Sequence, residues 1–223
     1  MRRSLAIFAT VALFVLSISA TSAFAKSIRL EVGLGGQGGD PDVEFAGVSD
    51  ELDTDTGLAI TAGLWSDGMV SAADWLSFGI QYLRLQDFDF SETASGTVLG
   101  VAVTGTLDLE PDIDAFMFNA AARQQSGKIH PFIGGGIGVA KSSVDASVTA
   151  TFTVNNSTLL LAGTADDDDT NFAWQFFGGV DYDFTDNIYA GVNLRYFGTD
   201  ATLFGADVEF RNLAAMGVIG YKF

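Results

Sequence analysis

The feature that most constrains this chain is a period of two in hydropathy that recurs along almost all of it. Eight segments of about ten residues carry large apolar side chains at every second position, with glycine or polar side chains between them. Between Leu76 and Tyr82, for example, every even-numbered residue is large and apolar. Because successive side chains of a strand point to opposite faces, each segment is expected to be a β-strand with one apolar face.

The residues between the large apolar ones decide between a water-soluble sandwich and a closed barrel. The second face of a sandwich strand is solvated and rich in Lys, Glu and Thr. Here that face is dominated by glycine, with isolated amides and charges of both signs, which is typical of the cramped interior of a small barrel. The inward polar residues are expected to pair as a network that fills the lumen: Arg29, Glu31, Gln81, Asn119, Arg123, Gln175, Asp181, Asn193, Arg195 and Lys222.

The connections between the segments alternate in length. Three are short, at 66–73, 125–128 and 185–186, and four are long, at 36–56, 87–114, 142–171 and 198–210. Short periplasmic turns and long external loops are the asymmetry of an outer-membrane barrel. We therefore predict an all-β, antiparallel up-and-down transmembrane barrel of eight strands. Strand-like stretches at 97–106 and 144–154 either extend hairpins above the membrane or add a strand pair, which leaves ten strands as the alternative.

Aromatic residues near the segment ends predict two girdles at the membrane surfaces. One lies near the short turns and the other near the long links. The residues expected near the short turns are Trp65, Trp75, Tyr182, Tyr221 and Phe223, and Trp174 is expected at the other end.

Residues 1–25 are predicted to be a cleaved signal peptide, followed by a barrel domain over residues 26–223. Arg2 and Arg3 form a basic start, a 14-residue apolar stretch follows, and Ala23 and Ala25 supply the small residues of a cleavage site. The apolar stretch is shorter than the roughly 20 residues that a membrane-spanning helix needs.

Most of the acidic residues lie in the long links, which are predicted to be external. The net charge of −17 argues against a nucleic-acid binder, and the absence of cysteine excludes disulfides and thiolate chemistry. The four long links hold 22 of the 28 acidic residues and no basic residue. Acidic loops keep an external rim solvated. A second interpretation is that clusters such as Asp166, Asp167, Asp168 and Asp169 collect divalent cations that bridge lipopolysaccharide phosphates.

Three motifs resemble the eight-stranded outer-membrane β-barrel family, which includes OmpA-like and OmpX-like barrels and proteins of the porin family. Residues 131–138 (PFIGGGIG) look like the family's Pro-aromatic-x-Gly-x-Gly-x-Gly strand, and residues 179–187 look like its strand and tight turn. The end of the chain, with Ile219, Tyr221 and Phe223, resembles the signal that the barrel-assembly machinery reads.

The resemblance covers most of residues 26–223 and implies a location in the outer membrane of a Gram-negative bacterium. It implies contact with outer-membrane lipid or lipopolysaccharide and with the assembly machinery, and a monomeric state. The implied role is structural or at the surface: envelope integrity, adhesion, or contact with an extracellular ligand or host through acidic external loops.

No motif assigns catalytic, cofactor-binding or firm metal-binding residues. His130 is the single histidine and is expected at the periplasmic start of a strand as a structural residue. The glycine run at 134–138 lacks the Lys-Ser/Thr and the helix of a phosphate loop. We therefore expect no enzymatic activity. The alternative function is a small cation-preferring channel, and a third is a lipid-modifying barrel enzyme, which would need a catalytic pair at the outer rim.

Overall fold

The structure, a computed structural model, describes residues 27–39, 42–45, 48–51, 56–68, 73–86, 90–98, 101–154 and 157–223. The described strands are β1 (Ser27–Gly39), β2 (Asp42–Phe45), β3 (Val48–Glu51), β4 (Gly57–Asp67), β5 (Leu76–Gln86), β6 (Phe90–Val98), β7 (Val101–Arg123), β8 (Ile129–Val154), β9 (Ser157–Asp183), β10 (Ile188–Leu203) and β11 (Ala206–Lys222). This part of the chain contains no helix of the length and hydropathy that a membrane crossing requires. The predicted signal peptide and its cleavage site lie outside the described residues.

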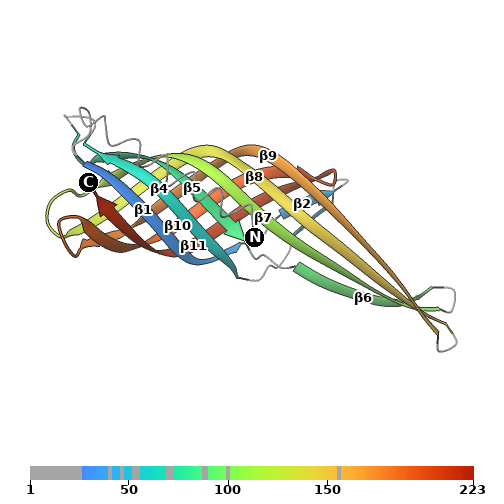
Figure 1. Ribbon diagram of the computed structural model, residues 1–223. Coiled ribbons are helices and arrows are strands. Elements are labelled where there is room, and N and C mark those ends of the chain that lie inside the picture. Colours follow the sequence, from blue (N-terminus) through green and yellow to red (C-terminus); the bar gives the residue numbers. More distant parts are fainter. Residues whose placement is uncertain are drawn as a thin grey trace.

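Eight of the described strands close into an antiparallel ring, in the order β1-β4-β5-β7-β8-β9-β10-β11 (Figure 1). The ring closes because β11 pairs with β1 from Lys222 opposite Arg29 to Asn212 opposite Gly39. Within the ring, closure gives every strand a hydrogen-bonded neighbour on both sides, as a chain in lipid requires. The prediction of an up-and-down barrel is therefore confirmed with eight strands in the ring. The remaining strands lie outside it: β6 pairs with β7, and the β2–β3 hairpin pairs with β11.

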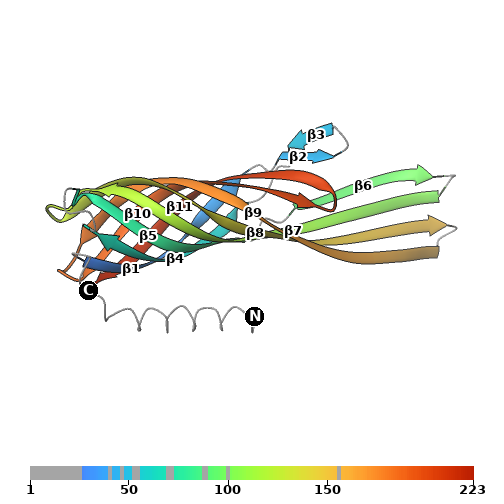
Figure 2. The ribbon, with the colours of Figure 1, turned by 90° about the horizontal axis from the view of Figure 1, so that it is seen from above.

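Three ring strands continue far beyond the others. β7, β8 and β9 have 23, 26 and 27 residues, whereas β4 and β5 have 11 each. With β6 they form a four-stranded antiparallel sheet that extends past the end of the ring (Figure 2). We call β6 and residues 101–111, 145–154 and 157–168 the projecting sheet.

The projecting sheet corrects the prediction of long loops at 87–114 and 142–171. Most of these residues are strand, because they are rich in Thr, Val and Ala at alternating positions, which suit a pleated sheet. The strand-like stretches at 97–106 and 144–154 thus lengthen two hairpins and add no strand to the ring.

The outward face of the ring is an apolar belt. Ile133, Phe176 and Leu194 are each at least 60% exposed there, in positions that face lipid. Trp75, Tyr182, Tyr221 and Phe223, predicted for one girdle, are 43–67% exposed near the short turns. The prediction for Trp65 was wrong: its side chain is 5% exposed and points into the lumen, because the odd-numbered residues of β4 face inward.

Cross-strand ion pairs follow the apolar belt at its end nearer the projecting sheet. Arg84 Nη2 lies 2.9 Å from Asp112 Oδ2 and joins β5 to β7, and Lys141 Nζ lies 2.9 Å from Asp168 Oδ2 and joins β8 to β9. Arg211 joins β11 to β10 in the same way and stacks on Trp174 at 5.6 Å. Trp174 therefore lies at the end of the belt for which it was predicted.

At the level of these ion pairs, the apolar and polar side chains of the strands exchange faces. On β5 the outward residues become Arg84 and Gln86 while the inward residues become Leu83 and Leu85, which are fully buried. A cluster of buried apolar side chains therefore fills this part of the lumen: Ala59, Leu83, Leu85, Ile113, Ala115, Met117, Ala140, Val144, Ala173, Phe197, Ala201, Leu203, Val208, Phe210, Ala214 and Met216. We call this cluster the apolar plug. The apolar plug corrects the prediction of an interior made only of polar residues and glycine.

Substitution of Gly79 tests the crowding of the lumen. A methyl group at this position would lie 2.6 Å from the Trp65 ring, so Gly79→Ala is expected to lower the free energy of unfolding by about 1–3 kcal/mol. Urea unfolding of the refolded protein in lipid vesicles, followed by tryptophan fluorescence, measures the change. Gly217→Ala is the control, because the nearest atom to its methyl group would be Leu34 O at 3.9 Å. Equal stability of the two variants would contradict a packed interior.

Candidate functional site

A buried ion pair joins the first two strands of the ring near the short turns. The Arg29 guanidinium donates from Nε to Asp67 Oδ2 at 2.7 Å and from Nη2 to Asp67 Oδ1 at 3.1 Å. Ser77 Oγ donates to the same carboxylate at 2.5 Å. All three residues are at most 4% exposed, so the pair is shielded from water and depends on these hydrogen bonds. Asp67 was not among the predicted lumen residues, although it follows the inward parity of β4.

Tyr189 is the centre of the surrounding polar cluster. Arg29 Nη1 donates to the Tyr189 hydroxyl at 3.1 Å, and that hydroxyl donates to Glu31 Oε2 at 3.1 Å. The guanidinium groups of Arg29 and Arg123 and the Lys222 ammonium lie 5.5–5.8 Å from the centre of its ring. Tyr189 was not among the predicted lumen residues, although its odd-numbered position on β10 indicates an inward side chain.

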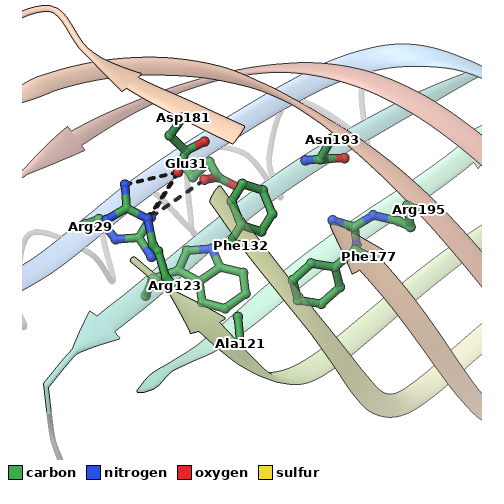
Figure 3. Close-up of a pocket in the computed structure, with 10 residues that line it drawn as sticks. Arg29, Glu31, Ala121, Arg123, Phe132, Phe177, Asp181, Asn193 and Arg195 are labelled. Atoms are coloured by element: carbon green, nitrogen blue, oxygen red, sulfur yellow. Dashed lines mark hydrogen bonds and ion pairs between the residues drawn. The ribbon is translucent and has the colours of Figure 1, made fainter. Parts of the chain in front are cut away.

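A second ion pair joins β7 to β9 on the lumen side of β8. Arg123 donates from Nε and Nη2 to Asp181 Oδ2, at 3.2 and 3.1 Å, and Arg29 Nη1 lies 4.0 Å from the same oxygen (Figure 3). The cavity beside these groups, which Asn193 also lines, has a volume of about 20 Å³. That is the space of one water molecule. The arrangement is a packed network with no room for a larger ligand.

A layer of amides around Arg195 separates this network from the apolar plug. Gln175 Nε2 donates to Asn119 Oδ1 at 2.5 Å, and Arg195 Nη1 donates to Gln81 Oε1 at 2.5 Å and to Gln175 Oε1. Arg195 is 1% exposed and stacks on Phe177 at 5.4 Å. Within the described residues, no carboxylate lies within ion-pair distance of Arg195. Arg195 therefore places a positive charge in the middle of the lumen, and its hydrogen bonds go to the neutral amide oxygens of Gln81 and Gln175.

The last predicted lumen residue, Lys222, lies at the mouth near the short turns. Its Nζ donates to both oxygens of Asp183 at 2.6 Å, and His130 Nε2 lies 2.8 Å from Asp183 Oδ2. His130 Nδ1 lies 2.7 Å from the carbonyl oxygen of Gln124. Both ring nitrogens of His130 therefore have a hydrogen-bond partner, one just after β7 and one on β9. The histidine thus joins β8, β9 and the C-terminal strand.

All ten predicted lumen residues face inward, and they form two groups rather than one network. Arg29, Glu31, Arg123, Asp181 and Lys222 meet around Tyr189, with Asn193 lining the adjacent cavity. Gln81, Asn119, Gln175 and Arg195 form the amide layer. Of the predicted assembly-signal residues, Ile219 and Tyr221 face outward on β11 and Phe223 follows its last residue; all three are 44–67% exposed.

The four carboxylates predicted as a cation cluster point in different directions, because they alternate along β9. Asp167 Oδ2 accepts from Phe204 N at 2.6 Å, Asp169 Oδ2 accepts from Thr202 N at 2.8 Å, and Asp168 pairs with Lys141. Among the described residues, no three metal-binding side chains are grouped to hold an ion. Asp167 and Asp169 instead connect β9 to the hairpin between β10 and β11.

The projecting sheet has two chemically different faces. Its inward face continues the apolar plug with Val103, Leu107, Val148, Phe152 and Leu159, whereas its outward face carries rows of Thr and Ser. Thr106, for example, lies opposite Thr93 and Thr149 in one row. Residues 93–107 and 146–165 contain no charged side chain. The tip of the sheet is therefore neutral, and its acidic residues lie at its base.

A closed antiparallel ring with a lipid-facing apolar belt and aromatic girdles defines a transmembrane β-barrel of the outer-membrane type. Residues 10–223 match the model of the outer membrane protein beta-barrel domain family, and the chain belongs to this family. The predicted family and the predicted location in the bacterial outer membrane are thus confirmed. The comparison with curated proteins finds no match.

Solved structures of several outer-membrane barrels are similar to the chain. The outer membrane protein OprG from Pseudomonas aeruginosa is 15% identical over 89% of this chain and 96% of its own, with a TM-score of 0.46. The N-terminal beta-barrel domain of OprF from the same organism is 14% identical over 89% and 98%, with a TM-score of 0.41. Ail of Yersinia pestis, solved with the heparin analogue sucrose octasulfate, is 10% identical over 88% and 99%, with a TM-score of 0.40.

Removal of the carboxylate of Asp67 tests the buried ion pair. Asp67→Asn is expected to lower the free energy of unfolding by about 1.5–3 kcal/mol, because the buried Arg29 would lose its hydrogen-bonded carboxylate and keep only Glu31 and Asp181, each 4.0 Å away. Urea unfolding in lipid vesicles measures the loss. Lys141→Gln is the control, since its pair with Asp168 is more than half exposed and is expected to contribute less than about 1 kcal/mol. A loss no larger than that of the control would show that the lumen pair contributes little to the free energy of unfolding.

The pH dependence of the β10–β11 hairpin tests the contacts of Asp169. Hydrogen bonds from Thr202 N, Thr170 N and the Asn171 amide lower the pKa of Asp169 below its usual value. A lowered pKa in the folded state stabilises the hairpin above the usual carboxyl value of about 3.9, and this contribution is lost as pH falls through the lowered value. We expect the hydrogen-exchange protection of the Thr202 amide to fall in that acidic range.

Asp169→Asn is the matched variant for this measurement. It should show less protection of Thr202 at neutral pH and no acidic transition. An identical pH profile in both proteins would exclude Asp169 as the titrating group.

Proposed function

We propose that this protein is a closed barrel that acts at the cell surface through its projecting sheet, without conducting ions and without catalysis. The observation that carries the proposal is the sheet itself. Four strands continue past the ring with a neutral tip, an apolar inward face and a hydroxyl-rich outward face. Such a surface offers backbone edges and apolar area to an extracellular macromolecule. Adhesion or attachment is therefore the form of surface role that we favour over a purely structural one.

The filled lumen supports closure over the alternative of a cation-preferring channel. The apolar plug occupies one part of the lumen, and the amide layer with its buried Arg195 occupies the next. A cation would have to cross both a dry apolar segment and a positive charge, and each of these opposes its passage.

The position of His130 supports a non-enzymatic role. This histidine, the single one in the sequence, is 2% exposed and bound to Gln124 and Asp183 at the end opposite the projecting sheet. A lipid-modifying enzyme with a Ser–His pair needs its histidine at the outer rim, so this third alternative has no support from the described residues.

Electrical recording tests the closed state. The chain from residue 26 onward, refolded and inserted in a planar bilayer, is expected to give no steady conductance. A heat-dependent shift in gel mobility first verifies that the sample is a folded barrel. Steady cation-selective steps would instead support the channel, and Glu31 and Asp181 would then be the residues to substitute.

Removal of the projecting sheet tests the surface role. Phe90 is directly opposite Leu109, and Asp145 is directly opposite Asp166. Replacing residues 91–108 and 146–165 each by Asn-Gly therefore closes both hairpins with two-residue turns. Bacteria that export this shortened protein are expected to attach to immobilised serum and matrix proteins no better than cells without it, while the gel shift is retained. Attachment equal to that of the full protein would contradict the proposal.

A further inference from the structure

The projecting sheet has one long free edge, along β9. Residues 157–166 pair with β8 on one side, and no strand of the described chain pairs with their other side. The pairing of β9 with β10 begins only at Ala173, and the carboxylates of Asp167 and Asp169 bind the hairpin in between. An edge of this length presents a row of N–H and C=O groups about 30 Å long to solvent.

This free edge lacks the features that usually prevent strand addition. Residues 157–165 contain no charge and no proline, and the side chains of residues 158–166 are all exposed. Leu159, Leu160 and Leu161 are 54–61% exposed. Leu159 lies opposite Phe152 on the apolar inward face, so an added strand with apolar residues at alternate positions would extend this face.

The base of the same edge carries a row of three carboxylates. Glu110 is directly opposite Asp145, and Asp145 is directly opposite Asp166, all of them exposed on the outward face. Like charges in directly opposed positions destabilise a sheet, and an opposite charge beside them stabilises it. Lys141 is already paired with Asp168. The position that an added strand would place opposite Asp166 therefore favours Lys or Arg.

We propose that the free edge of β9 binds an extended basic segment of another polypeptide as an added antiparallel strand. The bound segment runs in the direction of β8, with Lys or Arg near its N-terminal end beside Asp166. Its alternating apolar residues follow toward the tip, beside Leu161 and Leu159. This inference rests on the proposed surface function and names the chemistry of the partner.

A second copy of this chain fits the edge less well than a basic segment. The described basic residues lie in the lumen, near the short turns, or in pairs with acidic neighbours, as Arg84, Lys141 and Arg211 do. A copy would thus bring no available cation to Asp166. An anionic lipid phosphate would be repelled by the same row of carboxylates.

Binding of synthetic peptides to the refolded full chain in lipid nanodiscs tests the inference. The probe is a peptide long enough to cover residues 157–166, with lysines in its N-terminal third and alternating Val and Thr in the remainder. We expect it to bind and to protect the amides of residues 157–166 from hydrogen exchange. Peptides with Glu in place of Lys, or with the same residues scrambled, are expected not to bind.

Variants of the protein test the charged contacts and the apolar contacts separately. The triple variant Glu110→Gln, Asp145→Asn, Asp166→Asn should weaken binding of the lysine peptide about tenfold and reduce its salt dependence. Leu159→Thr with Leu161→Thr should also weaken it, since Thr keeps the strand and removes the apolar contact. Ala94→Thr on the other edge strand, β6, is the matched control and should leave binding unchanged.

Three outcomes would overturn the inference: failure of the lysine peptide to bind the unaltered protein, unchanged affinity in the triple variant, or self-association of the unaltered protein that protects residues 157–166 from hydrogen exchange and excludes the peptide. The attachment assay with the shortened protein keeps the two proposals distinct. Loss of attachment on shortening, without peptide binding, would retain the surface function and reject the basic strand as its partner.

Discussion

The pairing of β11 with β1 is the constraint on which the rest of the structure depends. A sheet in lipid has no water to satisfy its edges, so its first and last strands must pair. With eight strands the closed ring is narrow, and its interior must be filled by side chains. Glycine then becomes necessary where large groups cross the lumen, as at Gly79 beside Trp65.

Filling the lumen takes two chemically different forms along the barrel axis. Near the short turns, where the outward face is apolar, the inward face is polar and its charges are paired, as in Arg29 with Asp67 and Arg123 with Asp181. Beyond the outward ion pairs, the inward face becomes apolar and the outward face becomes charged. The barrel is therefore organised as a membrane protein at one end and as a water-soluble barrel at the other.

This reversal of faces explains how the projecting sheet emerges from the ring. Leu109 packs against the apolar plug, and the inward face of β7 continues outward from it through Leu107 and Val103. The other ring strands end earlier, so this apolar face is no longer opposed by the far side of the ring. The strands β7, β8 and β9 nevertheless stay paired in the same register. The acidic residues lie where the three strands leave the ring, so the charge forms a base beneath a neutral tip.

Much of the fold followed from local pattern, and the errors have physical causes. Period two predicted the ring strands and the inward parity of Arg29, Asp181 and Arg195, because side-chain direction on a strand depends only on position along it. Residues 142–171 are predicted from the segment spacing to be a long external link with a strand-like part at 144–154, yet residues 142–154 pair with residues 157–169 in continuous register across β8 and β9. Acidic side chains are compatible with a strand when both of its faces meet water.

The sequence by itself determined the class of protein: alternation, glycine content and link lengths are local properties, and they suffice to predict a transmembrane barrel. Only the tertiary structure decided which lumen residues meet, as Tyr189 does with Arg29 and Glu31 across the ring. The same holds for the free edge of β9 and for the row from Glu110 to Asp166. Contacts across a barrel and along neighbouring strands depend on register and closure, which join residues far apart in the chain and leave no local signal.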